Sequence, residues 1–305
     1  MMTWQGVMPA MTTCFNEDLS IDHGFVARHA QWMVEHGCTG IVTPGSLGEG
    51  NTLTFEERGA LWRTLVRAVG ERAPVVAAVS ALSTAEAVAQ AKLAAAQGCR
   101  GLMVLPPYVY RGDWREMKAH VAAVFRATPL SCMLYNNPLA YGTDFLPEQI
   151  QELAAEHETF QAVKESSADI RRVTALRVLV GNRLALCVGV DDAIVEGIGA
   201  GAVGWIAGLV NALPQESVEL FELAARGESA KAAELYHWFL PLLRMDTVPK
   251  FVQLIKLVQA EVGMGNTRVR SPRLELTGTE LSETLQVIRA ALAHRPAHQS
   301  RGERV

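Results

Sequence analysis

Residues 9–17 read PAMTTCFNE and contain no glycine. They cover the end of the first apolar run of the chain, which begins at residue 6, and the residues that follow it. An open, doubly wound α/β sheet normally binds a nucleotide at its first strand-to-helix turn, and that turn carries a glycine-rich fingerprint. Because residues 9–17 lack this fingerprint, the sequence favours a closed (β/α)8 barrel over an open sheet.

Eight short apolar runs, rich in β-branched residues, alternate with longer amphipathic segments around this stretch. Continuous apolar runs indicate strands that are covered on both faces, as in a parallel sheet inside a layer of helices. The longer segments, such as residues 22–35, 54–69 and 83–97, carry apolar residues at helical spacing. The predicted strands are residues 6–13, 40–43, 74–79, 101–105, 131–135, 160–164, 184–190 and 202–207.

The chain becomes helical after the eighth predicted strand. Four amphipathic segments follow, at residues 215–225, 229–243, 249–262 and 279–294. The predicted fold is therefore an α/β TIM barrel over residues 1–226 with a C-terminal helical appendage over residues 227–294. Residues 295–305 are polar and rich in arginine, and we expect a poorly ordered tail there.

Composition excludes several classes of function. The formal net charge of −4 leaves no positive surplus for nucleic acid. The five cysteines are scattered and form no CxxC pair, which disfavours a disulfide framework and agrees with a reducing cytoplasm. Neither a signal peptide nor an apolar stretch long enough to span a membrane is found in the sequence, so we expect a cytoplasmic protein with no membrane partner.

Lys164 is the most informative single residue. A barrel of this kind places its active site at the C-terminal ends of the strands and in the loops that follow, and Lys164 ends the sixth apolar run. Burial disfavours a charged ammonium, and a neutral lysine amine can attack a carbonyl to form a Schiff base. The alternative is a structural ion pair with Glu165 or Asp191.

Two other strand ends carry polar residues that suit the same chemistry. Tyr135 ends the preceding strand, where its phenol could move protons near Lys164 or could be a core tyrosine. The glycine-rich turn at residues 44–50 follows the second strand, and its backbone amides could hold a carboxylate or a phosphate. Within this turn, Ser46 could pass a proton from Tyr135 or could cap the turn.

Two further motifs are interpreted as structural. Asp191 and Asp192 stand where a helix should begin, so N-capping is preferred over metal binding. Residues 199–204 match GxGxxG, but they run from a helix into a strand, the reverse of a dinucleotide-binding turn. We expect no metal and no organic cofactor.

Taken in order, these motifs resemble those of the dihydrodipicolinate synthase and N-acetylneuraminate lyase family of class I, Schiff-base aldolases and dehydratases. The resemblance covers nearly the whole chain. It rests on Gly45-Ser46-Leu47-Gly48-Glu49 followed by Thr52-Leu53-Thr54 and Glu56-Glu57-Arg58, on Tyr135-Asn136-Asn137-Pro138 with Gly142, and on Val163-Lys164-Glu165-Ser166.

The resemblance implies a role for each of these positions. Lys164 would form the imine with a small-molecule 2-oxo acid, and Tyr135 would relay protons. Ser46 and the Leu47 amide would bind the substrate carboxylate. The resemblance also implies a homo-oligomer, either a dimer or a tetramer. The side of the pocket that recognises the distal part of the substrate would be lined by Asn137, Tyr141, Ser166, Ser167 and the loop at Gly189.

The sequence also departs from the family's best-known members. Lysine-biosynthetic members carry two threonines where this chain has Ser46 and Leu47, and an arginine where it has Ala140. They also carry paired tyrosines, whereas Tyr108 is followed here by Val109. Sialic-acid lyases usually show GSTGE, a motif that Leu47 interrupts.

We therefore expect a catabolic Schiff-base lyase that cleaves, dehydrates or deaminates pyruvate-related 2-oxo acids. Three alternatives are kept. The first is a dihydrodipicolinate synthase proper. The second is a non-catalytic protein that binds a 2-oxo acid, which intact Lys164 and Tyr135 disfavour. The third is a phosphate-binding or flavin barrel that uses the glycines of residues 199–204.

Overall fold

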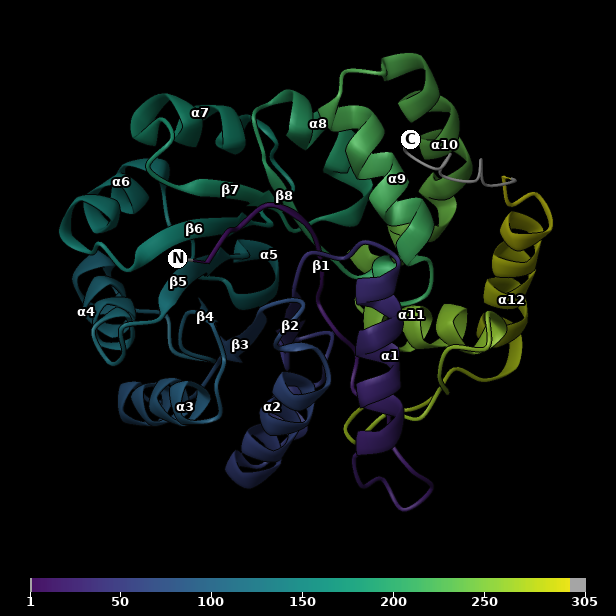
Figure 1. Ribbon diagram of the computed structural model, residues 1–305, viewed down its shortest axis with the longest axis horizontal. Coiled ribbons are helices and arrows are strands. Elements are labelled where there is room, and N and C mark those ends of the chain that lie inside the picture. Colours follow the sequence, from purple (N-terminus) through teal and green to yellow (C-terminus); the bar gives the residue numbers. More distant parts are fainter. Residues whose placement is uncertain (1, 297–305) are drawn as a thin grey trace.

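Parallel strands form the centre of the molecule, and helices surround them (Figure 1). The computed structural model describes residues 2–296. Its eight strands there confirm the predicted TIM barrel. They are β1 (Gly6–Pro9), β2 (Ile41–Thr43), β3 (Val75–Val79), β4 (Gly101–Val104), β5 (Ser131–Asn136), β6 (Phe160–Glu165), β7 (Ala185–Val188) and β8 (Gly204–Ala207).

The strands follow one another around the barrel in the order β1-β8-β7-β6-β5-β4-β3-β2. The barrel closes between β1 and β2 through a parallel bridge of Ala10 with Val42, where Met11 N donates to Val42 O at 2.9 Å. The first strand was predicted to end at residue 13 but ends at Pro9. The residues after Pro9 bond alternately to β8 and β2. Ala10 N donates to Ala207 O at 2.8 Å.

The helices in the first half of the barrel begin at polar caps. Thr54 and Asp113 each form a capping box, and Asp22 and Ser83 each accept a bond from the first turn of their helix. The helices are α1 (His23–Glu35), α2 (Phe55–Val69), α3 (Thr84–Ala96), α4 (Trp114–Phe125), α5 (Pro138–Tyr141), α6 (Pro147–Glu156), α7 (Arg171–Val180), α8 (Ile194–Gly199) and α9 (Pro214–Ala225). Short 3-10 turns are η1 (Gly50–Thr52), η2 (Asp191–Ala193) and η3 (Leu209–Asn211).

Further helices follow the barrel and lie together on one side of it (Figure 1). They are α10 (Ser229–Leu243), η4 (Arg244–Thr247), α11 (Phe251–Glu261) and α12 (Gly278–Ala293). The domain boundary between residues 226 and 227 stays a prediction. Of the predicted tail, residues 297–305 lie outside the described residues, while Arg295 forms an ion pair with the buried Glu216 of α9.

No helix within residues 2–296 is long and apolar enough to cross a membrane. The core fills the barrel and the space between strands and helices, and it includes Trp62, Trp205 and Phe160, all fully buried. Every residue of β3 is buried, as expected for a strand that is covered on both faces.

Candidate active site

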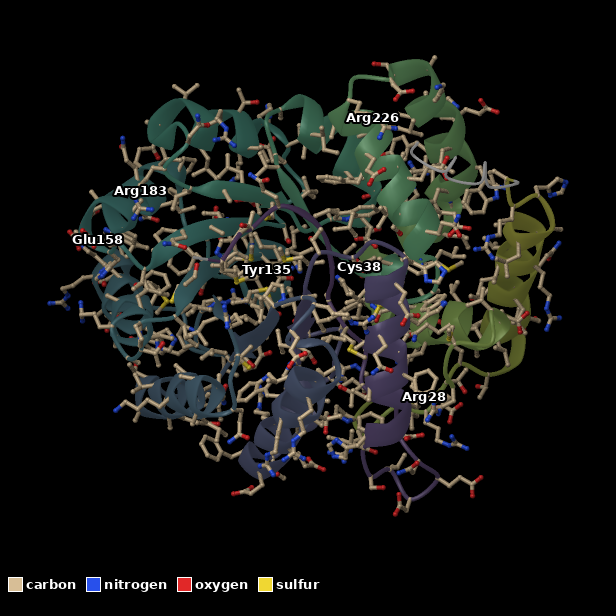
Figure 2. The ribbon with its side chains drawn as sticks, viewed as in Figure 1. Arg28, Cys38, Tyr135, Glu158, Arg183 and Arg226 are labelled. Carbon is tan, nitrogen blue, oxygen red and sulfur yellow. The ribbon has the colours of Figure 1, made fainter. Side chains whose placement is uncertain are left out.

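A cavity of about 660 Å³ opens at the C-terminal ends of the strands. It is lined by the residues predicted to have catalytic or substrate-binding roles, from four separate strand ends, except that Ser167 is not part of its wall. In Figure 2, Tyr135 lies near the middle of the ring of helices. The predicted residues that line the cavity are Ser46, Leu47, Tyr135, Asn137, Lys164, Ser166 and Gly189.

Lys164 lines this cavity. It pairs in register with Tyr135 of β5 and Cys187 of β7, and its side chain is 5% exposed. Its Nζ lies 4.2 Å from the centroid of the Tyr135 ring. Within residues 2–296 it forms no hydrogen bond or ion pair with a carboxylate.

The two carboxylates considered as structural partners of Lys164 are engaged elsewhere. Glu165 accepts from Asn136 Nδ2 at 3.0 Å and from Ser167 N at 2.7 Å, and burial raises the pKa of its carboxyl. Asp191 accepts from Trp205 Nε1 at 3.0 Å and from Leu209 N at 2.7 Å. The Lys164 amine is thus left for a molecule in the cavity.

The prediction that Asp191 and Asp192 cap a helix is wrong. Neither η2 nor α8 receives a side-chain cap, and Asp191 is fully buried instead. Its carboxylate holds the backbone amides of Gly208 and Leu209, so it fixes the loop after β8. Burial raises the pKa of Asp191 to about 6. The sequence pattern could not show this because the amides come from the loop after the next strand of the barrel.

Gly189 leaves room for the two side chains beside it. A Cβ atom at this position would lie 2.4 Å from Lys164 Cε and 1.9 Å from Ser166 Oγ. Both distances are far below van der Waals contact, so any other residue would displace the lysine. The Ser166 hydroxyl is buried and has no hydrogen-bond partner among the described residues. It is free to bond a molecule in the cavity.

Ser46 contacts a different tyrosine from the one expected. Its Oγ forms a hydrogen bond with Tyr141 Oη, while Tyr135 Oη accepts from Asn137 Nδ2 at 3.0 Å. The Tyr141 ring packs 5.7 Å from the Tyr135 ring and 5.6 Å from the Tyr108 ring, between centroids. Tyr141 therefore lies between the two residues that were expected to exchange a proton.

The turn at residues 44–50 contributes Ser46 and Leu47 to the cavity wall. Glu49 N and Gly50 N are used inside the turn, donating to Ser46 O at 3.1 Å and Gly45 O at 3.0 Å. The amides of Ser46, Leu47 and Gly48 have no hydrogen-bond partner within the described part of the chain. Two or three convergent amides of this kind form a cradle for a carboxylate.

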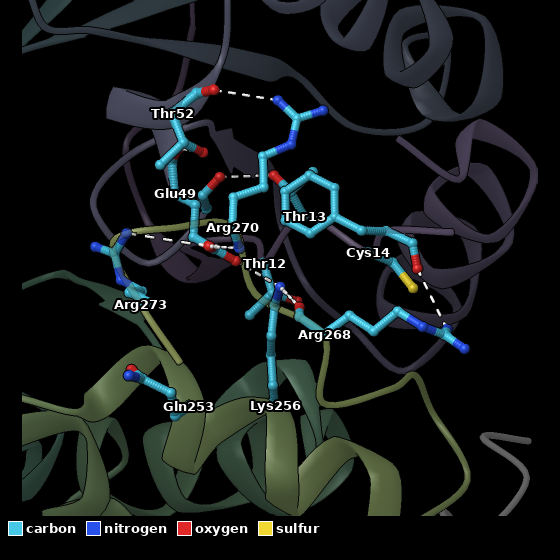
Figure 3. A network of polar contacts seen from close by, with 12 residues as sticks. Thr12, Thr13, Cys14, Glu49, Thr52, Gln253, Lys256, Arg268, Arg270 and Arg273 are labelled. Carbon is cyan, nitrogen blue, oxygen red and sulfur yellow. Dashed lines mark hydrogen bonds and ion pairs between the residues drawn. The ribbon is translucent and has the colours of Figure 1, made fainter. Parts of the chain in front are cut away.

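The C-terminal region holds this turn in place, as Figure 3 shows. Glu49 is fully buried, and its carboxylate accepts from Lys256 Nζ of α11 at 2.5 Å and from Arg270 N at 2.9 Å. The Arg270 guanidinium in turn pairs with Glu57 of α2 at 2.6 Å. The helices after the barrel thus fix the loop that carries Ser46.

Among the residues of the cavity wall that sequence reasoning missed, two are charged, Asp246 of η4 and Arg273 after α11. Both come from the C-terminal region, which strand-end reasoning does not cover. Burial raises the pKa of the Asp246 carboxyl well above its usual range, and the nearby Asp191 adds to this effect. The only feature of the sequence that could have indicated these two residues is that they are charged and lie outside the predicted helices.

A second cavity, of about 950 Å³, lies at the opposite end of the barrel. Its wall includes residues at the N-terminal ends of strands, among them Gly6, Pro74 and Arg100, and it contains none of the predicted site residues. Chemistry in such barrels belongs to the other end. Within residues 2–296, no group of three or more His, Cys, Asp or Glu side chains is placed to hold a metal ion.

Comparison with known proteins identifies the family. The model of the dihydrodipicolinate synthetase family matches residues 3–291. The 4-hydroxy-tetrahydrodipicolinate synthase of Chelativorans sp. (strain BNC1) is 31% identical over 292 residues, which is 95% of this chain and 98% of that protein.

Solved structures agree. Dihydrodipicolinate synthase DapA-2 of Bacillus anthracis superposes with a TM-score of 0.91 at 26% identity, over 97% of this chain and all of that one. The chloride-inhibited dihydrodipicolinate synthase of Acinetobacter baumannii, solved in complex with pyruvate, gives 0.90 at 26% identity over 95% and 99% of the two chains. The protein described here therefore belongs to the dihydrodipicolinate synthetase family and is an enzyme of the class I aldolase and lyase type.

Proposed function

We propose that this enzyme is a Schiff-base-forming lyase that acts on pyruvate or a related 2-oxo acid. The observation that carries the proposal is the position of Lys164. Its amine lies in the cavity beside Tyr135 and forms no hydrogen bond or ion pair with a carboxylate of the described residues. Ser46 and Leu47, whose amides have no partner there, line the same cavity. The related enzyme of Acinetobacter baumannii was solved with pyruvate bound, which supports the choice of ligand.

The proposed reaction begins with the substrate carboxylate on the amides of Ser46 and Leu47. The Lys164 amine forms a bond to C2 as the carbonyl oxygen takes a proton from Tyr135. The attacking nitrogen returns a proton to the Tyr135 oxygen, and Tyr135 passes this proton to the new hydroxyl. The hydroxyl leaves as water, so that a protonated imine and the Tyr135 phenolate remain. This imine accepts the electron pair released when a bond at C3 breaks.

Cleavage, water loss and ammonia loss all proceed from this imine, and we propose that the substrate is a catabolic 2-oxo acid. Ala140 and the Ser46-Leu47 pair depart from the lysine-biosynthetic pattern. The names of the relatives favour the alternative, a 4-hydroxy-tetrahydrodipicolinate synthase. Release of water or an aldehyde from hydroxylated 2-oxo acids, or of ammonia from 2-oxo acids that carry an amino group, would support the first assignment. Condensation of pyruvate with aspartate semialdehyde would support the second.

The test of the Schiff base is the mass of the intact protein after incubation with pyruvate and borohydride. We expect wild type to gain one reduced pyruvate, which Lys164→Ala does not gain. Lys231→Ala removes an exposed lysine of α10 and is the matched control, expected to behave as wild type. Circular dichroism reports whether Lys164→Ala is folded. An adduct on folded Lys164→Ala, or none on wild type, would refute the proposal.

We also infer a homo-oligomer, a dimer or a tetramer, in the cytoplasm. Val109 and Tyr110 after β4 support the first inference because they expose apolar surface, with Val109 90% exposed. All five cysteines are free thiols and buried, which supports the second.

A further inference from the structure

The wall of the active-site cavity contains a guanidinium that the proposed chemistry does not use. Arg273 lies in the segment between α11 and α12, is partly buried, and lines the cavity together with Leu47 and Asn51. Its Nη1 atom is buried and has no hydrogen-bond partner in the described part of the chain. The nearest carboxylate oxygen, Oε2 of Glu49, is 4.0 Å away, which is beyond hydrogen-bond distance.

Glu49 cannot serve as a dedicated counter-charge for Arg273. Its Oε1 accepts from Lys256 Nζ at 2.5 Å, and its Oε2 accepts from Arg270 N at 2.9 Å. One buried carboxylate therefore faces two cations, Lys256 and Arg273, and its strong bonds go to the first. Figure 3 shows Arg273 at the edge of this network, where a dashed line marks its 4.0 Å contact with the Glu49 carboxylate.

The neighbouring arginines of the same segment have other partners. Arg270 pairs with Glu57 at 2.6 Å, and Arg268 lies 3.6 Å from Glu17. Among the described residues that line the cavity, Lys164 and Arg273 are the two cations. Because Lys164 would be consumed in the imine, a second negative charge on the substrate could be neutralised only by Arg273.

We propose that Arg273 binds a second carboxylate, so that the preferred substrates are 2-oxo acids with a carboxylate at each end. The inference rests on the proposed function. The amides of Ser46 and Leu47 would hold the carboxylate next to the carbonyl, and the guanidinium would hold the distal one. A planar guanidinium suits this task because it can donate two parallel bonds to one carboxylate.

The test compares two five-carbon 2-oxo acids, 2-oxoglutarate and 2-oxopentanoate, which differ in the distal carboxylate. Each is incubated with the enzyme and borohydride, and the concentration that gives half-maximal adduct is measured by intact mass. We expect wild type to prefer 2-oxoglutarate. Arg273→Gln should raise the half-saturating 2-oxoglutarate concentration about tenfold to a hundredfold, the effect of losing a charged hydrogen-bonded pair.

Controls separate this inference from the proposed function. Arg273→Gln should weaken trapping of 2-oxoglutarate far more than trapping of pyruvate or 2-oxopentanoate, and Arg273→Lys should restore part of the preference. Arg268→Gln changes an arginine outside the cavity wall and should behave as wild type. If wild type traps pyruvate without preferring the diacid, or if Arg273→Gln weakens both acids equally, only the role of Arg273 fails. If wild type traps no 2-oxo acid, the proposed function itself fails.

Discussion

Tyr141 is the residue at which the polar groups of the cavity meet. Its hydroxyl bonds to Ser46, and its ring contacts the rings of Tyr135 and Tyr108. Burial, together with the neighbouring phenols of Tyr135 and Tyr108, raises the pKa of Tyr141 well above its ordinary value. The phenol therefore stays protonated at neutral pH and can donate to a developing oxyanion or to Ser46.

Replacing Tyr141 by phenylalanine removes this hydroxyl and keeps the ring. We expect pyruvate to form the imine about tenfold to a hundredfold more slowly in Tyr141→Phe, a loss within the range known for single proton-transfer groups. The rate is measured by quenching with borohydride at timed intervals. Tyr110→Phe, which changes an exposed tyrosine bonded to Glu116, is the control. Wild-type rates in Tyr141→Phe would show that Ser46 needs no phenol partner.

The reactive residues could be predicted wherever their position at the end of a strand determined which way their side chains point. Lys164 and Tyr135 end adjacent parallel strands, so the register brings them together. Tyr141 was predicted to line the cavity, but its bond to Ser46 was not, because α5 is a four-residue helix whose orientation depends on tertiary packing. Arg273 could not be found from strand ends, since the contacts that place it lie more than 200 residues earlier in the chain.

At the scale of elements, helix α1 depends on one buried polar contact. His29 of α1 is 1% exposed, and its Nε2 donates to Asn211 O of η3 at 2.7 Å. Its Nδ1 is buried and has no hydrogen-bond partner in the described residues. A proton on Nδ1 would place a charge in the core, and burial accordingly lowers the pKa of His29 to about 4.

This contact predicts a loss of stability in acid. Between pH 6.5 and 4 the unfolded chain binds a proton at His29 and the folded chain does not, so the free energy of unfolding falls as the pH falls. The full effect is about 3 kcal/mol at the most. We expect wild type to lose more stability than His29→Gln between pH 7 and 4.5 in urea unfolding. Asp191, with its raised pKa, titrates in both proteins, so its contribution to the pH dependence cancels when the two are compared. Parallel pH curves would contradict the prediction.

Element boundaries were predicted best where local chemistry decides them. Asp22, Thr54 and Ser83 are the first residues of predicted helical segments, and in the structure each caps its helix. Strand ends were less certain because tertiary bonds decide them. Asp191 illustrates the limit, since its amide partners belong to the loop after β8.

At the scale of the whole molecule, the C-terminal helices complete the active site as well as covering the barrel. Lys256 and Arg270 hold Glu49 of the Ser46 turn, and Arg273 and Asp246 line the cavity. The pair of Lys256 with Glu49 is almost fully buried, at 2% and 0% side-chain exposure. Removing one partner of such a pair leaves an uncompensated buried charge. The barrel and the C-terminal helices are therefore linked through the site itself.

Assembly gives the last prediction. Val109 is 90% exposed and has a φ of +71°, a left-handed conformation that costs a β-branched residue about 1 to 3 kcal/mol. Contact with a second copy of the chain would bury the apolar side chain of Val109, and the free energy gained by this burial would offset the cost of its backbone conformation. We expect sedimentation velocity to show an oligomer for wild type and a 33.1 kDa monomer for Val109→Asp. Val178→Asp, at a 78% exposed position of α7, should remain oligomeric. A monomeric wild type would show that Val109 is strained without a partner.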